Sequence, residues 1–177
     1  MIYIVLIFIV LFIFIISVLA YNSLKILNLQ VKNSLASVDV YLKQRFDLIP
    51  NLVEICKGYS KYENDLLNNL VKLRIQYNDN LSTHDKVVLD SKYSSIFALV
   101  ENYPELKANQ HFLDLQKNLS KIENQLQAAR RIYNHDVTRY NTRILTIPFN
   151  IFAKIFGFKK EQLFNINTDE VNTNIVI

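Results

Sequence analysis

The chain has 177 residues and a formal net charge of +4, which favours one domain and does not call for nucleic acid as a partner. A single cysteine excludes an internal disulfide and a cysteine-based zinc site. Two glycines in the whole chain exclude a glycine-rich phosphate-binding loop.

The first 20 residues carry no charged side chain and consist almost entirely of Ile, Val, Leu and Phe. A helix of about 20 residues rises about 30 Å, the thickness of the hydrocarbon core of a bilayer. Lipid forces a helix even on β-branched residues, because the backbone has to satisfy its own hydrogen bonds there. We therefore predict a transmembrane anchor at residues 1–21. A signal peptide cleaved after Ala20 is the alternative; the length of the apolar run and the lack of a preceding Lys or Arg disfavour it.

Basic residues follow this span and do not precede it, beginning with Lys25 and Lys32. The positive-inside rule then places the N-terminus outside and the rest of the chain in the cytoplasm. The predicted location is the cell (inner, cytoplasmic) membrane, crossed once.

Four further segments repeat apolar residues at the helical spacings of three and four. The first, from Leu24 to Ile49, follows the span without a breaker, so one helix is expected to carry both. The second runs from Leu52 to Tyr77, and Pro50 fits its first turn. One long helix kinked at Pro50 is the alternative, and we prefer a break because an antiparallel arrangement needs a reversal here.

The third segment extends from Leu89 to Tyr103, where Pro104 ends it. Ser82 or Thr83 is expected to cap the N-terminus of this helix.

The fourth and longest segment begins after Asn109, which can cap it, and reaches about Ile144. Pro148 then opens a short apolar segment over residues 149–156, which Gly157 ends.

Apolar faces of this length can hide only against one another. The sequence therefore predicts an all-α protein in which an N-terminal transmembrane helix precedes an antiparallel up-and-down four-helix bundle with coiled-coil-like packing. The bundle domain is expected at residues 22–164, and residues 165–177 are expected to form a flexible polar tail.

No pattern of reactive residues supports an enzyme. His84, His111 and His135 share no metal-ligand spacing, and solvated histidines are expected. Cys56 has no paired histidine by motif, so a structural thiol is expected. Glu-x-x-His pairs, which a di-iron bundle requires, are absent. We predict a protein without catalytic activity, metal or cofactor.

Two regions are candidates for binding. Arg139, Arg143 and Lys154 belong to a basic C-terminal third that could contact phospholipid head groups, with residues 149–156 on the bilayer surface. The alternative that we favour there is a solvated face and a helix that closes the bundle.

The second candidate surrounds Pro50 and comprises Arg45, Asp47 and Asn51. It is either a partner-docking site or, as we favour, a structural region. In the structural interpretation Arg45 pairs with an acid while Asp47 and Asn51 satisfy helix ends.

Six motifs occur in order over about residues 1–165: YNSL at 21–24, DVYLKQRFDLIPNLVE at 39–54, KGY at 57–59, YPELKAN at 103–109, AARRIYN at 128–134 and IFGF at 155–158. In this combination the chain resembles the LemA family of bacterial membrane proteins. The resemblance implies a short outer N-terminus, one transmembrane helix and a four-helix C-terminal domain, with no catalytic residues. The chain departs from the family pattern at Ile132, where an aromatic residue is more usual, and in the tail after Phe164.

The expected function is that of a membrane-anchored scaffold or accessory interaction protein in the cell envelope. Its expected partners are the lipid bilayer and an unidentified envelope protein, with homo-oligomerisation left open and no nucleic acid. The alternative is an anionic-lipid-binding or membrane-remodelling module.

Overall fold

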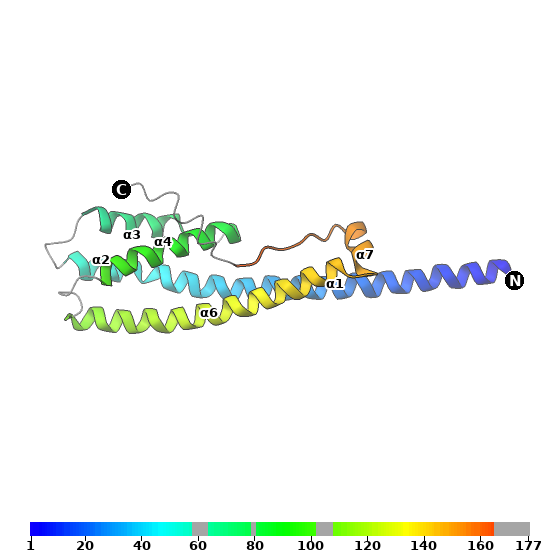
Figure 1. Ribbon diagram of the computed structural model, residues 1–177, viewed down its shortest axis with the longest axis horizontal. Helices are drawn as coiled ribbons and strands as arrows, with labels where there is room; N and C mark the ends of the chain where they lie inside the picture. The colour runs from blue at the N-terminus through cyan, green and yellow to red at the C-terminus, as the bar shows by residue number, and fades with distance from the viewer. Residues whose placement is uncertain (58–63, 79–80, 102–107, 165–177) are drawn as a thin grey trace. The chain divides into compact units, whose positions relative to one another are not determined.

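The computed structural model describes residues 1–57, 64–78, 81–101 and 108–164, and every regular element in this part is an α-helix (Figure 1). Gly58 and Pro104, and the expected tail at 165–177, lie outside the described residues. The chain divides into two compact units. The first unit is Met1–Leu35 with Arg131–Leu163, and the second unit is Ala36–Arg130 with Phe164–Ile177.

Helix α1 (Ile2–Asp47) is a single helix that carries both the apolar span and the first amphipathic stripe, as the absence of a breaker predicted. Residues 1–15 are exposed on every side, whereas from Ala20 onward one face is buried through Leu24 and Leu27. The hydroxyl of Ser17, the one serine of the span, donates a hydrogen bond to the Ile13 carbonyl oxygen at 2.8 Å. This bond gives the serine hydroxyl a hydrogen-bond acceptor within its own helix.

Only Leu48 separates α1 from α2 (Ile49–Lys57). Pro50 lies in the first turn of α2, where its missing N–H leaves no helical bond unmade. The interruption is one residue long, and residues 2–57 otherwise continue as one helix, so the structure shows no reversal of the chain at Pro50 and lies closer to the alternative of a single interrupted helix. Helix α3 (Asn64–Gln76) covers the later part of the second stripe, and α2 packs against α3.

The predicted caps of the next two helices are confirmed. In α4 (Thr83–Glu101), the Asp85 backbone N–H donates to Ser82 Oγ at 3.1 Å. In α6 (Gln110–Leu145), Asn109 Oδ1 accepts hydrogen bonds from the backbone N–H groups of His111 at 2.8 Å and Phe112 at 3.3 Å. Each side chain satisfies N–H groups that the first helical turn leaves without partners.

The short helix α7 (Phe149–Phe156) follows Pro148 and ends at Gly157, as the sequence predicted. Gly157 has a φ of 72°, and the Phe158 N–H donates to the Ala153 carbonyl oxygen at 2.9 Å. Glycine adopts this left-handed conformation without a Cβ penalty, which closes the helix sharply.

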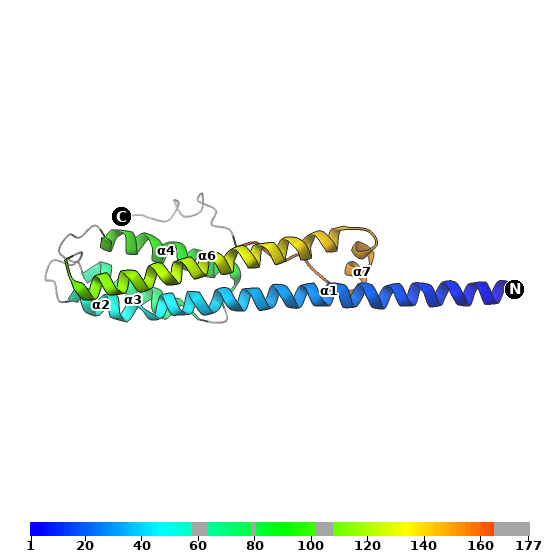
Figure 2. The same cartoon turned by 90° about the horizontal axis from the view of Figure 1, so that it is seen from below.

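Contacts inside the second unit fix the directions of its helices. The numbers of the contacting residues rise in the same direction along α1 and α4, and in opposite directions along α4 and α6. The pairs are Asp39 with Lys86 and Arg45 with Asp90 between α1 and α4, and Asp90 with Arg130 and Phe97 with Phe112 between α4 and α6. Thus α1 and α4 run parallel to each other, and α6 runs against α4 (Figure 2).

The apolar core of the second unit is organised around Phe46, which is fully buried. Its ring stacks on Tyr77 with centroids 4.6 Å apart and meets Tyr93 edge-on at 5.5 Å. Such aromatic pairs add about 0.5–1.5 kcal/mol each beyond the area that they bury. The core therefore joins α1, the end of α3 and α4.

Candidate functional site

A network of four charged side chains lies inside the second unit, next to the aromatic core. Arg45 Nη1 on α1 lies 2.6 Å from Asp90 Oδ1 on α4 and 2.9 Å from Glu123 Oε2 on α6. The other terminal nitrogen of Arg45 donates to Ser94 Oγ at 3.2 Å. One guanidinium therefore joins three helices.

Arg130 on α6 completes the network, because its Nη2 pairs with the second carboxylate oxygen of Asp90. The Asp90 side chain is 1% exposed, those of Arg45 and Arg130 are 10% and 15%, and that of Glu123 is 30%. Two guanidiniums face two carboxylates, so the network is neutral. Removing one member of such a buried set leaves an uncompensated charge.

Aromatic rings cover both guanidiniums. The Cζ atom of Arg45 lies 4.4 Å from the centre of the Tyr93 ring, and that of Arg130 lies 5.1 Å from the Phe164 ring. Burial raises the pKa of Asp90, while Arg45 and Arg130 oppose that rise. Burial likewise raises the pKa of the Tyr93 hydroxyl.

A pocket of about 280 Å³ opens beside this network, lined by Arg45, Tyr93, Phe97, Leu119, Ser120, Glu123 and Asn124. Among its polar lining groups, Arg45 pairs with Glu123 and also with Asp90, whereas the buried Tyr93 hydroxyl makes no hydrogen bond within the described residues. The ion pairs of the network hold α1, α4 and α6 together.

Two further ion pairs tie helices of the second unit to α1. Lys86 Nζ lies 2.8 Å from Asp39 Oδ1, with the Lys86 side chain 4% exposed. Arg74 Nη2 lies 2.6 Å from Asp47 Oδ1, and both of these side chains are largely exposed.

The three residues predicted around Pro50 do not form one site. Arg45 is buried in the charge network, Asp47 pairs with Arg74, and Asn51 is exposed on α2. The structural interpretation anticipated an acid for Arg45, and the structure supplies two. Asp47 bonds to a neighbouring helix through its side chain, which sequence alone did not indicate.

The three basic residues predicted in the C-terminal third lie in the first unit, and all are exposed. Arg143 covers the Phe149 ring, with Cζ 4.5 Å from its centre. Arg139 lies one turn earlier on α6, and Lys154 lies on α7.

Nothing in the described residues gathers the histidines. His84, His111 and His135 are exposed, and within the described ranges no three His, Cys, Asp or Glu side chains are placed to hold a metal ion. Cys56 is buried, and burial raises the pKa of its thiol to about 11. A protonated thiol is a poor nucleophile at neutral pH.

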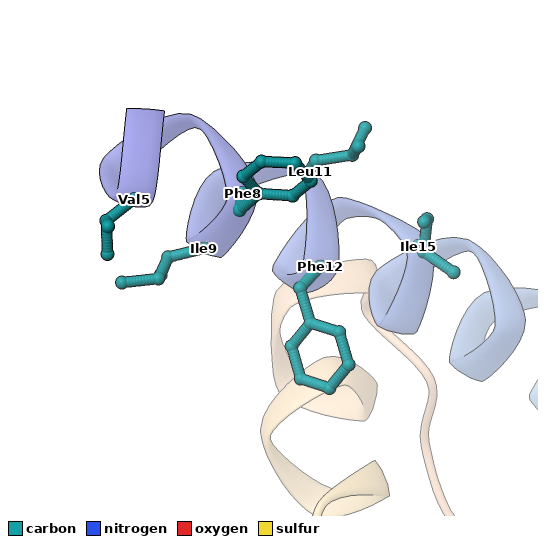
Figure 3. Close-up of a pocket in the computed structure, with 6 residues that line it drawn as sticks. All are labelled: Val5, Phe8, Ile9, Leu11, Phe12 and Ile15. Carbon is teal, nitrogen blue, oxygen red and sulfur yellow. The ribbon is translucent and has the colours of Figure 1, made fainter. Parts of the chain in front are cut away.

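The apolar span presents a groove of about 590 Å³ between the side chains of Val5, Phe8, Ile9, Leu11, Phe12 and Ile15 (Figure 3). All six belong to α1, so the groove is a depression in the surface of one helix and is lined by hydrocarbon. The helix is long and apolar enough to cross a bilayer. Lipid chains are the material that such a surface accommodates.

Sequence reasoning missed Asp90, Glu123 and Arg130 as network members. A signal was present: Asp90 lies four residues after Lys86 and three before Tyr93, in register with a buried face of α4. Charged residues were assigned to solvated faces, and this default hid the pattern.

Comparison with known proteins identifies the family of the chain. The sequence profile of the LemA family matches residues 34–177. The chain belongs to the LemA family. The protein LemA of Metamycoplasma hominis is 26% identical over 142 residues, which cover 77% of this chain and 63% of that protein. The chain thus spans less than two thirds of the length of this relative.

Shorter matches connect the chain to magnetosome proteins. Magnetosome protein MamQ 2 of Paramagnetospirillum magneticum is 30% identical over 69 residues, 39% of this chain and 25% of that protein. Magnetosome protein MamQ of Magnetospirillum gryphiswaldense is 27% identical over 70 residues, 40% of this chain and 26% of its own length. Membership of the LemA family and the apolar helix together fit a membrane-associated protein.

Proposed function

We propose that this LemA-family chain is a single-pass membrane protein whose folded part is a non-catalytic scaffold or accessory module of the cell envelope. The observation that carries the proposal is α1, one helix that begins as an exposed apolar span and ends with Arg45 in the buried network. An anchor that continues into a folded core without a flexible connection suits a tethered module.

The folded part is proposed to be an up-and-down bundle of α1, α3, α4 and α6, at residues 22–164 after an anchor at 1–21. Support comes from the helix directions in the second unit. At the C-terminal end of α3, Arg74 pairs with Asp47, and the Tyr77 hydroxyl just after it donates to the Asp39 carbonyl oxygen, an order of contacts that suits α3 running against α1. Alternating directions are the pattern of a bundle with short connections.

The proposed orientation has the N-terminus outside and the folded part in the cytoplasm, in the inner membrane. Its support is Lys25 and Lys32 after the span. A test places a probe cysteine in the tail, Asn172→Cys in a Cys56→Ala background, and treats intact cells with a membrane-impermeant thiol reagent. The expected result is labelling only after lysis, whereas labelling of intact cells contradicts the orientation.

The proposed partners are an envelope protein and, through homo-oligomerisation, further copies of the chain. The full-length protein, tagged and expressed at its native level, is purified from membranes in mild detergent. We expect a stoichiometric envelope protein or a defined oligomer, and an equally tagged unrelated single-pass protein as control should bring down neither. Recovery of a lone monomer in several detergents contradicts the scaffold role.

The alternative function, anionic-lipid binding or membrane remodelling, is favoured by one observation. Ile151 and Ile155 of α7 are 57% and 69% exposed in a unit rich in Lys and Arg. Flotation with liposomes in a salt-sensitive way is its signature.

A further inference from the structure

We propose that α7 is a second membrane contact, lying on the surface of the anionic leaflet with Ile151 and Ile155 inserted into it, beside the point where α1 leaves the lipid. This inference rests on the proposed anchoring by α1. It adds the element, the residues and the class of lipid that they meet.

The two faces of α7 differ in the way that an interfacial helix requires. Ala153 is buried with 1% exposure, and Phe149 and Phe152 beside it are half-buried. Ile151 and Ile155, four residues apart, lie on the opposite face. Two exposed isoleucines on an eight-residue helix gain stability when apolar material covers them, because burial removes their apolar surface from water.

Exposed apolar residues also occur at the end of α6 and in the connection that leads to α7. Leu145 is 58% exposed and Ile147 is 82% exposed. Together with Ile151 and Ile155 they place four exposed large aliphatic side chains in one short stretch of chain, residues 145–155, which we call the patch. Such concentration is uncommon on a water-facing surface and marks an interaction site.

The position of α7 along α1 identifies what covers the patch. Tyr21, directly after the apolar span, meets the Phe156 ring edge-on at 5.1 Å and lies 5.9 Å from the Phe158 ring. Tyrosine is enriched at the lipid–water boundary. The C-terminal end of α7 therefore lies level with the end of the span, at the depth of the head groups, and not farther out in water.

Charge selects the kind of lipid. The first unit contains eight basic and two acidic residues, Asp136 and Glu161, out of 20 and 16 in the chain. The basic residues next to the patch are Lys154 on α7 and Lys159 and Lys160 just after it, all exposed. Each basic residue close to an anionic leaflet strengthens binding by about fivefold. Lysines that border an apolar face are the composition of helices that lie in the interface.

The test measures the depth of single positions in the full-length chain, reconstituted into phosphatidylcholine vesicles with and without phosphatidylglycerol. An environment-sensitive fluorophore is attached to one cysteine at a time in a Cys56→Ala background. The positions are Leu11→Cys in the span, Ile155→Cys on α7 and Lys72→Cys on the exposed face of α3. Emission wavelength and quenching by aqueous iodide are recorded.

We expect the labels at Leu11→Cys and Ile155→Cys to be blue-shifted and several-fold less quenched than the label at Lys72→Cys. Protection of the label at Ile155→Cys from iodide quenching should be greater in vesicles that contain phosphatidylglycerol, and it should decrease as the salt concentration rises. If Ile155→Cys is as accessible as Lys72→Cys while Leu11→Cys stays protected, this inference is wrong and the anchoring stands. If all three are accessible, the anchoring fails too.

A charge variant tests the choice of lipid without disturbing the fold. Lys154→Glu, Lys159→Glu and Lys160→Glu together change only exposed side chains. We expect them to abolish the difference between vesicles with and without phosphatidylglycerol at Ile155→Cys. The matched control, Lys117→Glu with Lys121→Glu on the exposed face of α6 in the second unit, should retain that difference. Loss of the difference in both variants would contradict a specific role for the α7 lysines.

Discussion

The first unit contains eight basic and two acidic residues, whereas the second unit contains the remaining twelve basic and fourteen acidic ones. The first unit is therefore net +6, and the second is net −2. The first exposes large aliphatic side chains along α1 and α7. The second buries Phe46, Tyr77, Tyr93 and Phe112 and pairs Arg45 with Asp90 in its interior.

This difference shows how one chain can suit two solvents. Exposed apolar surface with basic neighbours is stable against lipid head groups and acyl chains, and it is costly in water. A folded unit in water instead buries apolar groups and can keep a charge inside only with a partner.

The largest effect is expected from three charges in the span: Ile7→Asp, Val10→Asp and Phe14→Asp together. An Asp at mid-membrane costs roughly 2.5–3.5 kcal/mol, so three cost roughly 8–11 kcal/mol. The apolar residues of the span supply a comparable amount, at about 0.3–0.6 kcal/mol each. The triple variant should leave the membrane in alkaline carbonate extraction, while Val10→Asp alone should stay. Retention of the triple variant contradicts anchoring by α1.

The next effect is expected at Arg45→Ala, which leaves Asp90 and Glu123 without their shared partner. Loss of one partner in a buried ion pair costs about 3–5 kcal/mol. Urea unfolding of the full chain in detergent, followed by circular dichroism, measures this loss. Arg74→Ala is the matched control, because its pair with Asp47 is exposed and should cost about 0.2–1 kcal/mol. Similar losses in both variants would mean that the network is not structurally important.

Alkaline pH should destabilise the second unit through Cys56. Burial raises the pKa of its thiol from near 9 to about 11. The unfolded chain therefore loses this proton first, and stability falls as pH rises between about 9 and 11, by about 2–3 kcal/mol. Unfolding free energies across this range should fall less steeply in Cys56→Ala than in the parent chain. Parallel curves for the two proteins would show that the thiol does not contribute.

The smallest effect is expected at the cap of α6. Asn109→Ala removes the acceptor for the His111 and Phe112 N–H groups and should cost about 1 kcal/mol in the same urea assay. Lys117→Ala, exposed on the same helix, should stay within about 0.5 kcal/mol of the parent. A cost at Asn109 no larger than at Lys117 would show that the cap is dispensable.

Local chemistry explains which parts of this fold are predictable from sequence. Asn109, Ser82 and Gly157 act within a few residues of their own positions, so their capping roles follow from residue type and spacing. The continuity of α1 follows equally from the lack of a breaker.

The charge network is not predictable in the same way. Arg45 pairs with Asp90, which is 45 residues away, and with Glu123, which is still farther along the chain. Which acid it meets depends on the register between helices, and helical periodicity leaves that register open. The same holds for α7: its sequence indicates a short apolar segment after Pro148, and the contact of Phe156 with Tyr21, which lies beside the end of the span, is not predictable from that pattern.

The central claim is that residues 1–20 stay in lipid as the first part of α1. The most direct test isolates the protein from cells, determines whether it is in the membrane or the soluble fraction, and determines its N-terminal sequence. We predict a chain that retains residues 1–20 and remains in the membrane pellet after alkaline carbonate. A chain that begins at Tyr21 and is recovered in the soluble fraction would contradict the claim.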